Sequence, residues 1–419
     1  MTAAPQAVET LLAQTDRDIA SYLEACVHCG ECAEACHFYQ ATKDPKHTPT
    51  YKLQPLVKAY KRHKAPLRSV RAILGLTPPE VTEEELREWE PLVYDSCTMC
   101  GRCTLVCPMG IDIAGTIRKM REGYAVAGIV PEGLNVARAN VERTSSPMGV
   151  TAKALLAQVK HQEKDTGLEI PVNQEGVDYL AIFSSHEIMA SPEIIGGYAK
   201  IFKKAGVTWT LSTEAYEATN VGVQIGFGPL ARDLVKRIVD EAERLGVKYV
   251  IAPECGHAYG AIRWAGPNLI GRPFKFEVVH IVELLDKLRR EGKIPAGEKD
   301  TRKMTLHDPC QLIRRGGVLK EPRRLISDSA TNFVEMKGAG INNLCCGGGG
   351  GVSANERAEE LRTKAFAQKL DQIDEIGDVE LIVIPCANCR GVFEDGLDAY
   401  ERDYEVIGLG ELVAETLKE

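Results

Sequence analysis

The sequence lacks the features of an exported or membrane-spanning protein. Segment 1–26 carries acidic residues where a signal peptide needs an apolar run, and no window of about 18 uncharged apolar residues occurs anywhere in the chain. We therefore expect a cytoplasmic protein that reaches a membrane only by association with a partner. An excess of basic residues is also absent, since the net charge is −8, and this disfavours a general nucleic-acid-binding role.

The composition shows no bias that would place the chain outside the ordinary globular class. Its 419 residues are 44% hydrophobic and 26% charged, which suits two or three domains with full cores. Cysteine is the exception. Fourteen cysteines without an export signal indicate metal or redox chemistry rather than structural disulfides.

Eight of the cysteines form two runs with one spacing, C-x-x-C-x-x-C-x-x-x-C. Three thiolates of such a run surround one [4Fe-4S] cubane cluster, and the fourth reaches the cluster of the other run when two runs are present. A pair of zinc sites is the alternative, although zinc sites usually show paired C-x-x-C knuckles. Pro108 fits the ferredoxin pattern, whereas His37 stands in the equivalent place after the first run. The runs predict one cluster on Cys26, Cys29, Cys32 and Cys107, and a second on Cys97, Cys100, Cys103 and Cys36.

The segment 37–96 between the runs has the pattern of helices joined by polar connections. A basic stripe crosses it and has two interpretations. It is either a solvated helix face or a docking surface for an acidic partner or for lipid headgroups. Its members are Lys52, Lys58, Lys61, Arg62, Lys64, Arg68 and Arg71.

After Gly149 the chain shows a helix, a polar linker and then alternating strand and helix signals, which favour parallel sheets flanked by helices. An internal repeat is also visible. FEVVHIVELLDKL (276–288) matches YEVIGLGELVAETL (404–417), and KYVIAPECGHAYGAI (248–262) matches ELIVIPCANCRGVF (380–393). The C-terminal part is therefore two copies of one α/β unit, and only the second keeps its cysteines.

Three motifs in the second copy, HDPCQL, LCCGGGGG and PCANC, resemble the cysteine-rich CCG domain of heterodisulfide reductase catalytic subunits and of related iron–sulfur subunits. The first domain resembles the α-helical ferredoxin of fumarate-reductase and heterodisulfide-reductase iron–sulfur subunits. The resemblance implies an α+β multidomain protein. It would comprise an α-helical two-cluster ferredoxin domain (1–150), a linker (151–176), a degenerate CCG unit (177–300) and an intact CCG unit (301–419).

In heterodisulfide reductase an intact CCG domain holds a noncubane [4Fe-4S] cluster on five cysteines. The resemblance therefore implies one such cluster here, in addition to the two cubane clusters. Glycines after the adjacent cysteines permit positive φ and let amide N–H groups approach the sulfurs, so we expect Gly347, Gly348 and Gly349 to border the cluster. A glycine-rich segment has two other interpretations, a phosphate-binding loop and a flexible link. By motif position, the ligands would be Cys310, Cys345, Cys346, Cys386 and Cys389.

The first copy departs from this ligand pattern. It offers roughly His186 where Cys310 stands, the segment 219–222 in place of the adjacent cysteines, and Cys255 approximately over Cys386, with His257 close by. This pattern, with one cysteine in the first copy and the full set in the second, most resembles the DsrK, HmeD and TmcB proteins. These are related iron–sulfur proteins of sulfur-metabolising membrane complexes. We expect a pocket beside the surviving cluster, with Cys255 as a reactive thiol and the two histidines as proton donors. A buried cysteine kept only for packing is the other interpretation of Cys255.

The resemblance implies an oxidoreductase that moves electrons between two cubane clusters and a noncubane site. That site would act on a disulfide or trisulfide within a quinone-linked complex containing a haem b membrane subunit or other electron-transfer subunits. One alternative is a relay subunit between a flavoprotein dehydrogenase and quinone. A second alternative is a scaffold or redox sensor without catalysis.

Overall fold

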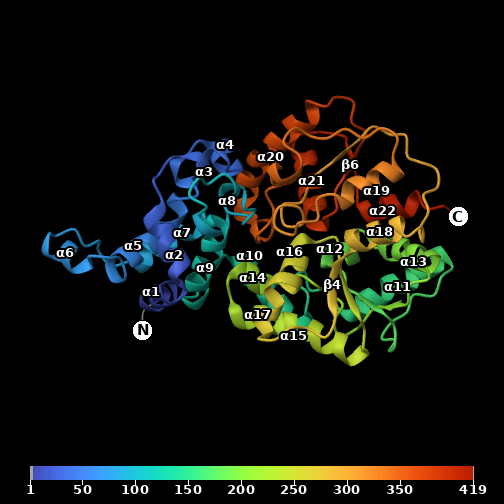
Figure 1. The fold of residues 1–419 in the computed structure, drawn as a ribbon, viewed down its shortest axis with the longest axis horizontal. Helices are drawn as coiled ribbons and strands as arrows, with labels where there is room; N and C mark the ends of the chain where they lie inside the picture. The colour runs from blue at the N-terminus through green and yellow to red at the C-terminus, as the bar shows by residue number, and fades with distance from the viewer. Residues whose placement is uncertain (1–2, 419) are drawn as a thin grey trace. The chain divides into compact units, whose positions relative to one another are not determined.

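The computed structural model describes residues 3–418 (Figure 1). These residues divide into two compact units. The first unit contains the chain up to Asn135 together with the segments Gly222–Pro229 and Gly347–Gln368. The second contains Val136–Val221, Leu230–Cys346 and Lys369–Glu419. Packing thus divides the chain differently from the linear boundaries expected from the sequence, because two segments of the α/β region belong to the helical unit.

The first unit is helical, and polar side chains fix where several of its helices begin. Asp16, Thr82 and Asp112 accept hydrogen bonds from backbone N–H groups in the first turns of α2, α7 and α9. The helices are α1 (Ala3–Gln14), α2 (Arg17–Ala25), α3 (Glu31–Glu34), α4 (His37–Thr42), α5 (Gln54–His63), α6 (Arg68–Ile73), α7 (Glu83–Tyr94), α8 (Arg102–Leu105) and α9 (Ile113–Val126).

Two helices at the centre of this unit pack closely because of a glycine. A Cβ on Gly123 of α9 would lie 2.8 Å from the Leu11 side chain of α1, and both Ala7 and Leu11 are fully buried. The segment 347–368 adds its own apolar contacts, since Val352, Ala358 and Ala365 form a buried cluster with Phe38. The helical unit is therefore completed by residues from the C-terminal third of the chain.

The second unit contains two parallel sheets. The first has the strand order β2-β1-β3-β4, and the second has the order β5-β6-β7. Short apolar runs rich in β-branched residues form them, as expected for strands buried on both faces. The strands are β1 (Tyr179–Ala181), β2 (Trp209–Thr210), β3 (Tyr249–Ala252), β4 (Glu277–His280), β5 (Met304–Leu306), β6 (Leu381–Val383) and β7 (Glu405–Ile407).

The two sheets repeat one topology, as the internal repeat predicts. Phe333 forms a parallel bridge with Met304 of β5, in the place that β2 takes beside β1. The order Phe333, β5, β6, β7 in the second sheet therefore matches the order β2, β1, β3, β4 in the first. The expected α+β architecture with repeated parallel sheets is confirmed.

The remaining helices lie between residues 132 and 415. The segment 151–176 contains a helix, α11, whose Leu155 and Val159 are buried in the core of the second unit. No helix among residues 3–418 combines the length and apolar character needed to cross a bilayer. The helices are α10 (Glu132–Thr144), α11 (Ala152–Thr166), α12 (Ser185–Met189), α13 (Glu193–Ala205), α14 (Val221–Ile225), α15 (Gly228–Leu245), α16 (Gly256–Tyr259), α17 (Gly266–Ile270), α18 (Ile281–Arg290), α19 (Glu321–Ser329), α20 (Glu359–Asp374), α21 (Ala387–Ala399) and α22 (Leu409–Glu415).

Candidate metal centres

The two cysteine runs fold into loops with the same backbone. In each loop the residue before the second cysteine is left-handed, with φ 53° at both His28 and Met99. The glycine after that cysteine is left-handed too, with φ 89° at Gly30 and 78° at Gly101, and a short helix follows. These turns curl the chain so that three thiols of a run face one point, and the helix carries the fourth cysteine away from them.

The eight thiols of the runs line two separate cavities. Each cavity is lined by three cysteines of one run and the last cysteine of the other. This is the crossed arrangement that the sequence predicts, although the identity of the bound group stays a prediction. One cavity is lined by Cys26, Cys29, Cys32 and Cys107, and the other by Cys36, Cys97, Cys100 and Cys103.

The surroundings of these thiols suit a bound metal cluster. Burial raises the pKa of Cys32 and Cys97, and it raises the pKa of Cys103 well above its ordinary value. A thiolate in such surroundings needs a cationic partner, because an isolated buried charge is costly. Iron within the cavities would supply that partner.

One lysine of the predicted basic stripe belongs to the second cavity instead of the surface. Lys52 is 1% exposed, lines the cavity of Cys36 and Cys97, and donates a hydrogen bond to the carbonyl of Ser96. A lysine side chain at this place would favour the more negative, reduced state of a cluster bound in the cavity. The sequence pattern did not reveal this role.

Arg121 of α9 holds the second cysteine loop against the glycine-rich segment. The residue is fully buried, and its guanidinium donates to the carbonyl oxygens of Val93 (2.9 Å), Cys97 (2.8 Å), Gln224 (2.7 Å) and Gly350 (2.5 Å). These four acceptors come from three segments of the first unit. Arg121 therefore fixes the backbone of a predicted cluster ligand.

The glycine-rich segment has a packing reason for its composition. A Cβ on Gly350 would lie 3.0 Å from the backbone of Thr98, and one on Gly351 would lie 2.8 Å from Leu134. Both residues have positive φ, at 63° and 87°. Close approach to the Cys97–Thr98 backbone and to Leu134 thus explains these two glycines, while the role of Gly347, Gly348 and Gly349 at a cluster stays a prediction.

The five C-terminal cysteines converge at the carboxyl ends of parallel strands. The sulfurs of Cys310 and Cys345 are 3.8 Å apart, and those of Cys346 and Cys389 are 3.3 Å apart. A hydrogen bond with the Cys389 thiol lowers the pKa of Cys386. All five residues are buried, at 2–7% exposed. Strand ends of this kind gather ligands in α/β folds, and five converging buried thiols fit a metal cluster.

An acidic residue of the HDPC motif organises the loop that precedes the adjacent cysteines. Asp308 receives two hydrogen bonds of 2.9 Å from Arg323, and its Oδ2 accepts from the Gly340 N–H at 2.5 Å. Its backbone carbonyl accepts from the side chain of Asn343. Asp308 thereby ties the loop 340–343 to the end of β5, two residues from Cys310.

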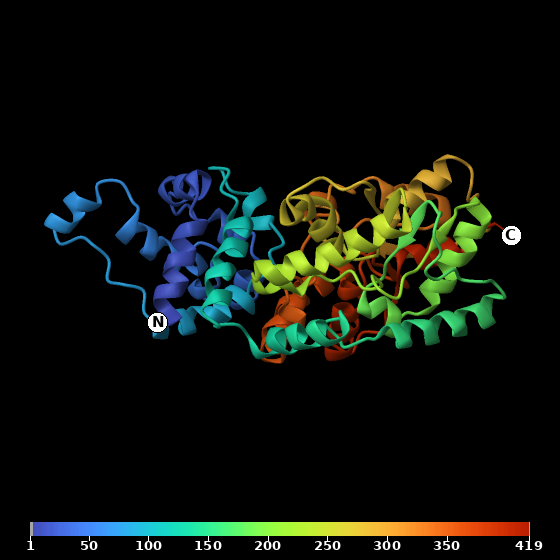
Figure 2. The same cartoon turned by 90° about the horizontal axis from the view of Figure 1, so that it is seen from below.

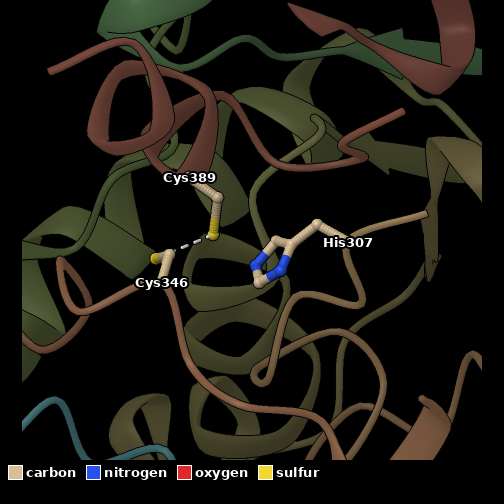
Figure 3. A group of neighbouring side chains, drawn as sticks. All are labelled: His307, Cys346 and Cys389. Atoms are coloured by element: carbon tan, nitrogen blue, oxygen red, sulfur yellow. Dashed lines mark hydrogen bonds between the residues drawn. The ribbon is translucent and has the colours of Figure 1, made fainter. Parts of the chain in front are cut away.

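A histidine that the sequence motifs did not single out lies among these thiols. A ring nitrogen of His307 and the sulfurs of Cys346 and Cys389 all lie within 4.8 Å of one another (Figure 3). His307 is fully buried, and neither ring nitrogen has a hydrogen-bond partner among the described residues. Burial lowers its pKa well below the ordinary value, so the imidazole is neutral.

Cys255 and Cys386 occupy equivalent positions in the two copies. Each stands at the N-cap position of a helix with an extended backbone, Cys255 before α16 at φ −147° and Cys386 before α21 at φ −163°. The Cys255 thiol accepts a hydrogen bond from the Ala258 N–H. The N–H of Ala387 donates to the Glu254 carbonyl at 2.7 Å, and the Gly256 N–H interacts with the Cys386 thiol. The two thiols are neighbours, although Cys255 is only 5% exposed and burial raises its pKa well above the ordinary value.

In the first copy, the carboxyl group of Glu217 links two loops. The equivalent loops of the second copy carry cysteines of the C-terminal site. Oε1 of Glu217 accepts hydrogen bonds from the N–H groups of Ser185 (3.1 Å) and Thr219 (3.0 Å). Burial raises the pKa of Glu217 to about 7, and its other oxygen has no partner among the described residues. Sequence reasoning missed this residue, because nothing in the letters EATNVG marks it as buried.

The two predicted histidines contact different segments of the second unit. Counting from the ends of β1 and β5 places Ser185 in the position of Cys310, with His186 one residue further. The ring of His186 faces α21, 3.3 Å from the point that a Cβ on Gly391 would occupy. Nε2 of His257 lies 3.0 Å from the carbonyl oxygen of Asn220. Their catalytic roles stay predictions.

Comparison with known proteins identifies two domains and several relatives. Residues 22–111 match the 4Fe-4S dicluster domain, and residues 304–394 match the Cysteine-rich domain. The chain is 28% identical to the Hdr-like menaquinol oxidoreductase iron-sulfur subunit 2 of Archaeoglobus fulgidus, over 96% of this chain and 81% of that protein. It is 29% identical to a subunit of the dihydromethanophenazine:CoB–CoM heterodisulfide reductase of Methanosarcina barkeri, over 94% of both chains.

A third relative has a different name and a longer chain. The EtfAB:quinone oxidoreductase of Syntrophomonas wolfei is 29% identical over 91% of this chain and 56% of that protein. Among solved structures, a glutamate racemase of Bacillus anthracis covers 58% of this chain at 12% identity, with a TM-score of 0.30 that supports no argument about the fold. The chain therefore carries the domains of an iron–sulfur electron-transfer oxidoreductase subunit.

Proposed function

We propose that this protein, an iron–sulfur protein of the heterodisulfide-reductase type, transfers electrons between two [4Fe-4S] cubane clusters and a noncubane [4Fe-4S] site that acts on a disulfide or trisulfide. One observation carries the catalytic part of the proposal. Cys255 keeps a thiol beside Cys386 at the equivalent helix N-terminus, although the rest of its copy has lost the predicted ligands. A copy that had simply decayed would have no reason to keep this thiol.

The proposed reaction consumes two electrons and two protons. Reduction of R–S–S–R′ breaks the sulfur–sulfur bond and yields two thiols, and the electrons arrive singly through the cubane clusters. Bound iron at the five-cysteine site would supply the one-electron chemistry. Glu217, with a pKa of about 7, is an acid that can give a proton near neutral pH, and His186 and His257 are the other candidates.

A quinone-linked complex is the proposed setting. Relatives with the names menaquinol oxidoreductase and heterodisulfide reductase support it. We propose a haem b membrane subunit as the electron partner, with this chain on the cytoplasmic face of the membrane. A membrane partner is needed in this proposal because the chain would exchange electrons with a lipid-soluble quinone.

A relay between a flavoprotein and quinone is the second candidate function. Two observations favour it: the similarity to an EtfAB:quinone oxidoreductase, and the burial that raises the pKa of Cys255. A buried protonated thiol is a poor nucleophile. In this role the C-terminal site would pass electrons without binding a sulfur substrate.

Replacing Cys255 with serine separates the two functions. If the thiol takes part in catalysis, Cys255→Ser keeps all three clusters but loses at least about 100-fold in disulfide-linked turnover, because a hydroxyl cannot form the mixed disulfide. The measurement is anaerobic turnover with a disulfide, together with electron paramagnetic resonance (EPR) spectra before and after addition of the disulfide. Cys386→Ser is the matched control and should lose the C-terminal cluster. Unchanged turnover and an unchanged substrate-dependent spectrum in Cys255→Ser would reject the catalytic role in favour of the relay.

A further inference from the structure

We propose that a ring nitrogen of His307 is an iron ligand at the C-terminal site, in addition to the five cysteines. The proposal rests on the presence of a cluster there, which is part of the proposed function. Its geometric basis is the grouping of His307, Cys346 and Cys389, whose ligand atoms lie within 4.8 Å of one another (Figure 3). Imidazole nitrogen and thiolate sulfur are both established ligands of iron in proteins.

The hydrogen-bonding state of His307 supports this role over a structural one. A buried imidazole normally has partners for its ring nitrogens, because an unsatisfied polar group in the interior costs free energy. Both nitrogens of His307 lack partners among the described residues, and its ring contacts Phe393 at 4.7 Å between centroids. An iron ion bound by one nitrogen would satisfy the group that the protein leaves unpaired.

The chain also positions His307 firmly at the site. Its backbone N–H donates to the carbonyl of Val383 at 3.0 Å, which fixes it to the end of β6, and the next residue is the anchored Asp308. A ring held at a sheet edge beside two buried thiols can bind metal without rearrangement of the backbone. The placement is thus preorganised.

Pulsed EPR tests the assignment without relying on turnover. Protein grown with 14N- or 15N-histidine should show a strongly coupled nitrogen on the C-terminal cluster, with the isotope-dependent change expected for iron-bound imidazole. His307→Gln should remove this coupling. His186→Gln and His257→Gln should keep it, and these two variants allow the assignment even if His307→Gln fails to fold.

Each outcome of the EPR experiment either supports or overturns the assignment of His307. A histidine coupling that persists in both control variants supports His307 as the ligand, and its disappearance in His307→Gln completes the assignment. A spectrum without strong histidine coupling, or coupling lost in His186→Gln or His257→Gln, overturns the proposal. Absence of the C-terminal cluster from the wild-type protein, measured as about eight irons per chain, would instead reject the proposed function.

A second inference concerns the exposed tip of the first unit, and a separate observation carries it. The segment 67–76, which includes α6, presents a set of aliphatic side chains to solvent within ten residues. Figure 1 and Figure 2 both show α6 projecting beyond α5. The exposed fractions are 74% for Leu67, 47% for Val70, 84% for Ile73, 63% for Leu74 and 64% for Leu76. We define this set as the apolar tip.

The base of the tip is closed by a salt bridge, so the exposed side chains belong to a defined projection. The side chain of Arg62 bonds to Glu80 and donates to the Pro78 carbonyl at 2.7 Å, and His63 lies 3.1 Å from the same glutamate. Arg68 donates to the His63 carbonyl at 2.8 Å. These contacts link the start and the end of the projection.

The charge around the apolar tip indicates which surface it meets. No Asp or Glu occurs between Asp44 and Glu80, although the chain as a whole has a net charge of −8, and Arg68 and Arg71 lie within the tip itself. Aliphatic side chains flanked by basic ones are typical of segments that insert shallowly into anionic membranes. The geometry points to the surface of an anionic lipid bilayer as the partner of the apolar tip.

Vesicle flotation tests this inference with the full-length holoprotein. Binding to vesicles with an anionic phospholipid is expected, with at least about tenfold weaker partitioning for Ile73→Ser/Leu74→Ser and for Arg68→Glu/Arg71→Glu. Trp264→Ser, which changes another exposed apolar residue, is the control and should bind as the wild type does. Absence of wild-type flotation, equal flotation of all variants, or a loss of self-association in the tip variants instead would each overturn the proposal.

Discussion

Replacing Cys107 with alanine should remove the cluster of the other cysteine run and leave the cluster beside its own run intact. The wild-type protein is expected to hold about twelve irons per chain, and Cys107→Ala about eight. The reason is the cavity that Cys107 shares with Cys26, Cys29 and Cys32. Anaerobic iron and sulfide analysis gives the number of clusters, and EPR of the reduced protein gives their identity.

Paired variants make this test independent of any assignment of spectra. Cys107→Ala and Cys26→Ala should leave the same residual EPR signal, because both remove the same cluster. Cys36→Ala and Cys97→Ala should leave the other signal, since these residues line the second cavity. If Cys107→Ala instead matched Cys97→Ala, each run would hold its own cluster and the crossed ligation would be wrong.

Replacing Arg121 with methionine should destabilise the first unit by about 4 kcal/mol. The substitution leaves the buried carbonyls of Val93, Cys97, Gln224 and Gly350 without their donor, and each orphaned acceptor costs about 1–3 kcal/mol before any relaxation. Urea unfolding of the anaerobic holoprotein, followed by circular dichroism, measures the change.

A surface arginine provides the matched control. Arg87 of α7 pairs with Glu83 at an exposed position, so Arg87→Met should change the free energy of unfolding by less than about 1 kcal/mol. Arg121→Lys keeps the charge with fewer donors and should fall between the two. Equal stability of Arg121→Met and Arg87→Met would contradict the central role assigned to the guanidinium.

Spacing between cysteines and the internal repeat were enough to predict much of the fold. Two runs of one spacing predict two loops of one shape, and the left-handed residues His28 and Met99 show that shared shape in detail. The repeat predicts two sheets of one topology because similar strand and helix segments bury similar faces. Equivalent helix-capping positions for Cys255 and Cys386 follow from the same alignment.

The parts that sequence did not reveal depend on burial and on contacts distant in the chain. The sequence around Lys52 does not distinguish it from the other lysines of the basic stripe, yet its side chain is buried inside the first unit. His307 and Glu217 each have a buried side-chain atom without a hydrogen-bond partner among the described residues, and the sequence does not reveal such burial. Gly350 and Gly351 lie against Thr98 and Leu134, and the sequence gives no sign of these close approaches.

The discontinuous first unit also constrains how the protein is made. Residues 347–368 belong to this unit, and Val352 and Ala358 pack on Phe38, so the unit cannot close until the ribosome has synthesised most of the chain. Both cysteine runs emerge much earlier than the segment that completes their surroundings. During translation the two cysteine loops therefore lack part of their final packing until residues 347–368 have been synthesised.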